Sequence, residues 1–136
     1  MRLQRYLDRI HTILTSRQEL VLEYLHIDEI VPGQVGMIEG RLRFGDNSLL
    51  EFTEAIAMHN MILAKTRYAY HYQNDKEQLI FRYDNAPHHP EVKTFPHHKH
   101  VMNLVNQLET IEPATAPHLN DVLREIDQFL YSASAY

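Results

Sequence analysis

The chain has 136 residues, which is the length of one domain with its own core, and we expect a single domain over residues 1–136. It contains no cysteine, which excludes disulfides, thiolate metal ligands and a cysteine nucleophile. The formal net charge of −5 argues against a surface that binds nucleic acid by bulk positive charge.

No membrane or export segment is visible in the sequence. The N-terminal residues MRLQRYLDRIHTIL lack the unbroken apolar core of a signal peptide, and no apolar stretch is long enough to cross a bilayer. We therefore expect a cytoplasmic protein that makes no contact with a membrane.

Apolar residues recur at helical spacing at both ends of the chain, which predicts one amphipathic helix at each end. In the first fourteen residues they are Leu3, Tyr6, Leu7, Ile10, Ile13 and Leu14. Near the end they are Leu119, Val122, Leu123, Ile126, Phe129 and Leu130. The final residues 131–136, rich in serine and alanine, are expected to be frayed.

Between the helices, short runs of β-branched, aromatic and leucine residues alternate with turn residues, as is typical of strands. The predicted strands are Leu20–Ile30, Met37–Phe44, Ser48–Ala57, Ile62–Tyr72 and Leu79–Tyr83. Their short connections favour consecutive antiparallel pairing. The predicted fold class is therefore α+β, a five-stranded antiparallel meander flanked by the two helices.

A histidine- and proline-rich segment follows the last predicted strand. Three prolines in residues 85–100 disfavour helix and predict an ordered or semi-ordered loop. Residues 101–116 are left unassigned, because their apolar spacing suits a helix but Pro113 limits it. The part of this segment from Val101 to Pro113 could be a partner-binding surface.

Strand alternation divides the predicted sheet into an apolar face and a basic face. Tyr68, Tyr70 and Tyr72 share the side expected to be covered by the helices, so we interpret them as core residues rather than as a platform for stacking bases. The opposite face is expected to carry Arg41, Arg43, Lys65, Arg67, His71 and Arg82.

This basic face contains the parts of a metal-independent ribonuclease. Arginines can hold a phosphate, and a nearby histidine can transfer a proton close to neutral pH. These residue types are common, so the alternative is a solvated face on which the arginines pair with Glu39, Glu51 and Asp84.

The segment His97–His100, HHKH, offers a second chemistry. Closely spaced imidazoles bind zinc, nickel or copper, and His88 and His89 could add ligands. The lysine within the segment and the flanking prolines favour a loose loop instead, so no metal or other cofactor is assigned.

Three strings of sequence resemble a known family: RLRFGDNSLLEFTE at 41–54, YAYHYQ at 68–73 and LIFRYDNAPHHPEVKTFPHHKH at 79–100. They closely resemble the TumE family of small proteins, described as toxins of type II toxin-antitoxin pairs, and the similarity covers nearly the whole chain. The resemblance implies a growth-inhibiting toxin, suspected of acting on RNA. Its expected partner is an antitoxin, typically a helix-turn-helix DNA-binding protein encoded beside it.

The resemblance indicates where the functional site lies but assigns no catalytic triad. The residues of the matching strings that it places in this site are His71, Arg82, Asp84, His88, His89, His97, His98 and His100. We assign as candidate catalytic residues His71, Arg82, Asp84, His97, His98 and His100, and as candidate substrate-binding residues Arg41, Arg67, His88, His89 and Lys99.

Three functional hypotheses follow. The leading one is a toxin that acts as a metal-independent endoribonuclease; the others are a non-catalytic protein-binding module with structural histidines, and a metal-dependent hydrolase with histidine ligands. An edge strand such as Leu20–Ile30 could also pair with its own copy to form a homodimer, although a helix or loop could equally cover it.

Overall fold

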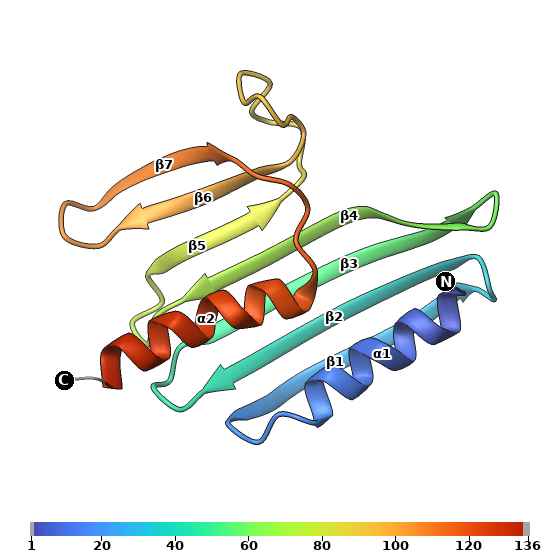
Figure 1. Ribbon diagram of the computed structural model, residues 1–136, viewed down its shortest axis with the longest axis horizontal. Coiled ribbons are helices and arrows are strands. Elements are labelled where there is room, and N and C mark those ends of the chain that lie inside the picture. Colours follow the sequence, from blue (N-terminus) through green and yellow to red (C-terminus); the bar gives the residue numbers. More distant parts are fainter. Residues whose placement is uncertain (1, 135–136) are drawn as a thin grey trace.

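The computed structural model describes residues 2–134, which form two helices and one sheet (Figure 1). The elements are α1 (Leu3–Thr15), β1 (Leu20–Val31), β2 (Val35–Phe44), β3 (Leu49–His59), β4 (Ile62–Gln73), β5 (Leu79–Asp84), β6 (His98–Asn103), β7 (Leu108–Pro113) and α2 (Leu119–Ser134). Among these residues, neither helix is both long and apolar enough to cross a membrane.

The sheet is a seven-stranded antiparallel meander in the order β1-β2-β3-β4-β5-β6-β7. The α+β class, the two flanking helices and the antiparallel sheet are confirmed, but the expected number of five strands is wrong. The two missing strands, β6 and β7, form a hairpin from residues expected to be loop or left unassigned. Their sequences HKHVMN and LETIEP show little apolar alternation, because backbone pairing holds them rather than a buried side-chain stripe. In this pairing β6 bonds to β5, and β7 bonds to β6.

The histidine- and proline-rich loop is therefore shorter than expected and does not follow the last strand. It covers residues 85–97 and connects β5 to β6, projecting beyond the end of the sheet (Figure 1). The C-terminal helix continues to Ser134, into the tail expected to be frayed. Residues 135 and 136 of that tail lie outside the described residues.

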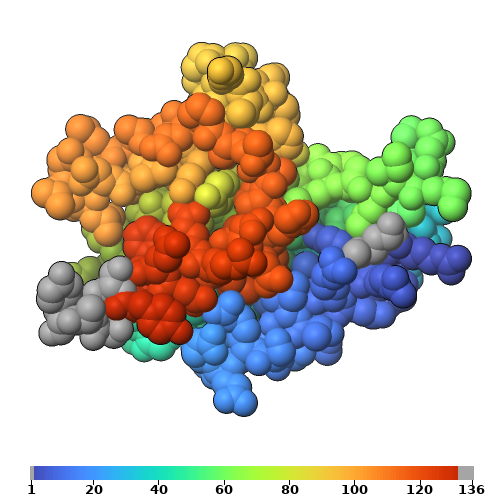
Figure 2. Space-filling view, viewed as in Figure 1, coloured from blue at the N-terminus to red at the C-terminus, as the bar shows by residue number. Residues whose placement is uncertain are grey.

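Both helices lie on one face of the sheet, and Figure 2 views the molecule from this side. Their apolar stripes and the inward residues of the central strands form one core. Tyr68, Tyr70 and Tyr72 are 2%, 0% and 1% exposed, as expected for core residues. Neither helix of the described residues lies on the other face of the sheet, so residues 2–134 form two layers.

A bulge in β4 changes which face one basic residue occupies. The pairing of β3 with β4 shifts between Ala55 and Ile56, so that Arg67 pairs with Ala55 but Lys65 pairs with Ile56. The extra residue reverses the alternation before Arg67. Lys65 was expected on the basic face and instead lies on the helix-covered face, where its Nζ donates to the Tyr70 hydroxyl at 2.5 Å and to the Pro117 carbonyl at 2.7 Å.

Lys65 belongs to a buried polar cluster around Glu54, whose side chain is completely buried. Tyr6 of α1 donates a hydrogen bond to Glu54 Oε1, and Tyr70 of β4 donates to Oε2 at 2.5 Å. The Lys65 ammonium lies 4.0 Å from Oε2. Burial is the main cause that raises the pKa of both tyrosines and lowers that of Lys65, and the Glu54 carboxylate raises the tyrosine values further while opposing the shift of Lys65.

At the centre of the sheet, the ring of Phe52 packs directly against the backbone of Gly40. Gly40 of β2 pairs with Phe52 of β3, and the Phe52 ring lies over the glycine. A Cβ at position 40 would meet Phe52 Cε1 at 2.3 Å, so only glycine leaves room for the ring. Phe52 in turn stacks on Tyr70, with the ring centroids 6.0 Å apart.

We predict that Gly40→Ala lowers the free energy of unfolding by about 1–3 kcal/mol, because the Phe52 ring must move out of a packed core. Urea unfolding followed by circular dichroism measures the change. Gly45→Ala is the matched control, since nothing lies within 4 Å of a Cβ there. Equal stability of the two variants would contradict the steric role of Gly40.

We predict that Lys65→Met lowers the free energy of unfolding by about 3 kcal/mol, because it leaves the buried Glu54 carboxylate without its cation. Thermal and urea unfolding measure this loss. Lys93→Met, outside the cluster, serves as the control, and a loss no larger than in that control would show that the two tyrosine hydroxyls alone compensate Glu54.

Candidate active site

The open face of the sheet carries a row of polar side chains that crosses five strands. Direct cross-strand pairs join Arg41 to Glu51, Glu51 to His71, His71 to Arg82, and Arg82 to His100. Residues paired in this way project to the same face, so their side chains are neighbours. The row thus places Arg82 between two histidines, His71 and His100.

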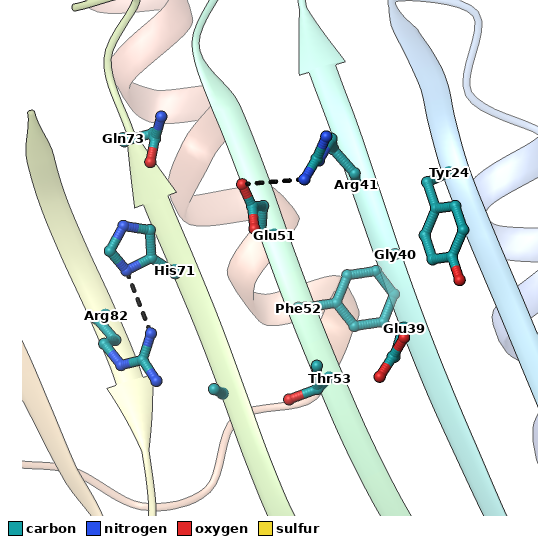
Figure 3. A pocket seen from close by; sticks show the side chains of 11 residues that line it. Tyr24, Glu39, Gly40, Arg41, Glu51, Phe52, Thr53, His71, Gln73 and Arg82 are labelled. Carbon is teal, nitrogen blue, oxygen red and sulfur yellow. Dashed lines mark hydrogen bonds and ion pairs between the residues drawn. The ribbon is translucent and has the colours of Figure 1, made fainter. Parts of the chain in front are cut away.

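Two hollows in the open face meet at Arg82. The first has a volume of about 460 Å³ and includes Tyr24, Arg41, Glu51 and His71 in its lining. Figure 3 shows these side chains on neighbouring strands, with His71 and Arg82 facing each other. The second hollow, of about 730 Å³, is lined by residues that include Arg67, Asp84 and His88.

Arg82 is held in place from both sides. Its Nε donates to Asp84 Oδ2 at 2.9 Å, and its Nη1 lies 3.3 Å from His71 Nδ1. Burial and, after it, the nearby Arg82 charge lower the pKa of His71, so this imidazole is neutral at pH 7. The Arg82 side chain is still 37% exposed and can contact an anion in the hollow.

Asp84 organises the other end of the site. Burial alone would raise its pKa, but hydrogen bonds from the Ala86 N–H and the Arg82 guanidinium, with the nearby His98, hold the pKa below its usual range. Its Oδ1 lies 3.0 Å from His98 Nε2, and its Oδ2 lies 3.4 Å from His100 Nε2. One carboxylate therefore positions Arg82 and both strand-β6 histidines.

The loop of residues 85–97 brings a further histidine to this cluster. The His89 ring lies 4.9 Å from that of His98 and 5.5 Å from that of His100, measured between ring centroids. A nitrogen from each of the three rings lies within 4.8 Å of one from each of the others. His98 is 2% exposed, which is rare for a histidine without a satisfied partner.

Two of the sequence-predicted residues lie on the other face. Lys99 alternates with His98 and His100, and its Nζ donates to Glu125 of α2 at 2.7 Å. His97 stacks on Tyr68, and the Tyr68 hydroxyl lies 2.9 Å from His97 Nδ1. Burial and then the Asp84 charge raise the pKa of that tyrosine to about 12. His97 and Lys99 thus lie away from the row that contains Arg82.

The remaining predicted residues gather on the open face, from Arg41 in the first hollow to His89 beside the strand histidines. Two of the three ion pairs expected for a solvated face are also present, at 3.8 Å between Arg41 and Glu51 and 2.9 Å between Arg82 and Asp84. Arg41 and Glu51 are half exposed, so their pair contributes little to stability.

Sequence reasoning missed Glu109 of β7. Its Oε1 accepts a hydrogen bond from His100 Nδ1 at 2.6 Å. Glu109 pairs with Met102 and lies diagonally opposite His100, which a register of β6 and β7 would have revealed. The sequence pattern of residues 101–116 predicts no defined element, so it gives no register from which to place Glu109.

The fold and the site define an α+β protein with a polar, histidine-rich cluster on an open antiparallel sheet. The model of one protein family, described as toxin TumE, matches residues 10–130, and the chain belongs to this family. No curated protein and no solved structure gives a significant match to the chain.

We predict that Arg82→Gln raises the pKa of His71 toward the ordinary histidine value of about 6.5, because it removes the adjacent positive charge. The remaining burial still lowers the pKa, so the shift is partial. An NMR titration of the imidazole Cε1–H signal measures it. Arg43→Gln, on the same face but hydrogen-bonded to Glu23, should leave the value unchanged; equal effects of both variants would refute the assigned cause.

Proposed function

We propose that the chain is the toxin of a type II toxin-antitoxin system and that it inhibits growth as a metal-independent endoribonuclease. The observation that carries the proposal is the cross-strand row in which Arg82 stands between His71 and His100. Phosphodiester cleavage requires a cation at the phosphate and proton-transfer groups on its two sides. The family membership supports the toxin part of the proposal.

The proposed reaction is an internal transesterification. His71, neutral because of its lowered pKa, removes the proton of the ribose 2′-hydroxyl, whose oxygen attacks the adjacent phosphorus. Arg82 stabilises the negative charge of the crowded phosphorane. The bond to the 5′ oxygen breaks as His100 donates a proton to it, which yields a 2′,3′-cyclic phosphate and a free 5′-hydroxyl.

The other residues of the open face have supporting roles in this proposal. Asp84 holds Arg82 and His100 at fixed positions through the same carboxylate oxygen, Oδ2. Arg41 and Arg67 line the two hollows that meet at Arg82, and in these positions they would contact phosphates on either side of the cleaved one. His88 lines the same hollow as Arg67 and would also face the RNA strand.

The proposed partner is a cognate antitoxin of the helix-turn-helix type. An exposed apolar group at the tip of the β6–β7 hairpin supports a protein partner: Leu104, Val105 and Leu108 are 40%, 96% and 62% exposed. The same group supports the second candidate, a non-catalytic toxin that acts by binding a cellular protein.

We predict that induction of this chain alone arrests bacterial growth and that the purified, tag-free protein cleaves RNA in the presence of a chelator. The variants His71→Asn and Arg82→Gln should each lower the rate of cleavage by at least about 100-fold and relieve the arrest, because they remove the base and the phosphate contact. Gel analysis of RNA ends and growth curves measure both effects.

The matched control is His11→Ala, an exposed histidine on α1, which should behave as the wild type at equal expression. Growth arrest without turnover of any RNA would refute the ribonuclease and favour the binding toxin. Cleavage that a chelator abolishes and a metal restores would favour the metal-dependent hydrolase.

A further inference from the structure

The imidazoles of His98 and His100 are oriented by groups that can only accept hydrogen bonds. His98 Nδ1 lies 2.9 Å from the Pro96 carbonyl oxygen, and His100 Nδ1 lies 2.6 Å from the Glu109 carboxylate. Each Nδ1 therefore carries a hydrogen and donates it. In the neutral rings this leaves the Nε2 lone pair as the free acceptor of each.

Both Nε2 lone pairs point at the same place. The Nε2 atoms of His98 and His100 are 3.1 Å apart, and Asp84 Oδ1 lies 3.0 Å from His98 Nε2. Three acceptor atoms at such distances repel one another unless a proton or a metal ion lies among them. A shared cation removes this repulsion for all three at once.

The distances suit a transition-metal ion. Nitrogen ligands at about 2.0–2.1 Å from a tetrahedral zinc are about 3.4 Å apart, close to the separations of these atoms. His89 supplies a third imidazole from the loop of residues 85–97, with its side chain 28% exposed and a nitrogen within 4.8 Å of the other two. Donation of Nδ1–H to a carbonyl or carboxylate is also the usual arrangement around histidine ligands.

We propose that His89, His98 and His100 bind one divalent transition-metal ion, with Zn²⁺ as the expected species. Imidazole nitrogens and a carboxylate suit zinc, whereas calcium and magnesium prefer oxygen ligands alone. Asp84 Oδ1 is placed to complete the coordination, because Arg82 contacts the other oxygen of that carboxylate. The positive charge of Arg82 lies near this site and disfavours binding of the metal ion.

An ion at this site would occupy Nε2 of His100, the residue assigned to proton donation. If the proposed function is correct, zinc therefore inhibits RNA cleavage instead of supporting it. This consequence rests on the proposed function, whereas the binding site itself does not.

The binding test uses tag-free, chelator-treated protein titrated with ZnCl₂ in competition with a chromogenic chelator. We expect one equivalent to bind, and Co²⁺ in place of zinc to give the visible absorption of tetrahedral coordination. His89→Ala should weaken zinc binding by at least about 100-fold, and Glu109→Gln, which keeps an acceptor for His100 Nδ1 but removes its negative charge, by about tenfold.

His88→Ala is the matched control, because it alters the adjacent histidine in the same loop but none of the proposed ligands, and it should bind zinc as the wild type does. Circular dichroism of each variant verifies the fold. Equal losses in His88→Ala and His89→Ala, several equivalents bound without preference, or no binding by the folded wild type would overturn the site.

The activity arm separates the two proposals. Cleavage by metal-free protein that one equivalent of zinc suppresses would support inhibition. An inactive metal-free protein that zinc activates would overturn inhibition and the metal-independent mechanism, while the titration still decides the site. If neither form cleaves RNA, the proposed function fails and the titration alone decides the site.

Discussion

The buried carboxylate of Glu54 is the constraint on which the two-layer structure depends. A charge in an apolar core is tolerated only when it is fully hydrogen-bonded and paired, and here the partners come from α1 and β4. One of them, Lys65, also donates to the carbonyl of Pro117, two residues before α2. The requirement therefore ties both ends of the chain to the centre of the sheet. The bulge in β4 places Lys65 on the covered face, within reach of this carboxylate.

The same helix layer determines which side chains are free for function. Glu125 of α2 accepts hydrogen bonds from Tyr83 of β5 and Lys99 of β6, and this contact holds both strands against the helix. Because alternate residues of a strand face opposite ways, His98 and His100 must then point to the open face. The covered face thus orients the candidate active site without contributing a group to it.

The two proposals for the open face compete for His100. The proposed metal-independent ribonuclease uses the row containing His71, Arg82 and His100, whereas the proposed metal site uses the neighbouring group of His89, His98 and His100. His100 belongs to both. A toxin in which a bound metal ion and proton transfer exclude each other would respond to the metal supply of the cell, which links the further inference to the proposed function.

Much of the candidate site was predictable from residue types, but the face of the sheet on which each of its residues lies was not. The alternation of β4 and β5 correctly placed His71 and Arg82 together on the open face, while it could not separate His97 and Lys99 from His98 and His100, because no strand was expected there. Lys65 was misplaced for a related reason: a bulge changes the alternation without leaving a sign in the composition. Glu109 was missed because its contact with His100 needs the register of two strands.

The sequence by itself determined the two helices, the first five strands, the aromatic core and the family, since each of these depends on local periodicity or on contiguous strings of residues. The tertiary structure alone decided the β6–β7 hairpin, the burial of Glu54 with Lys65, and the meeting of His89 with His98, His100 and Asp84. Those features depend on backbone pairing and on contacts between residues distant in sequence, which no local pattern records.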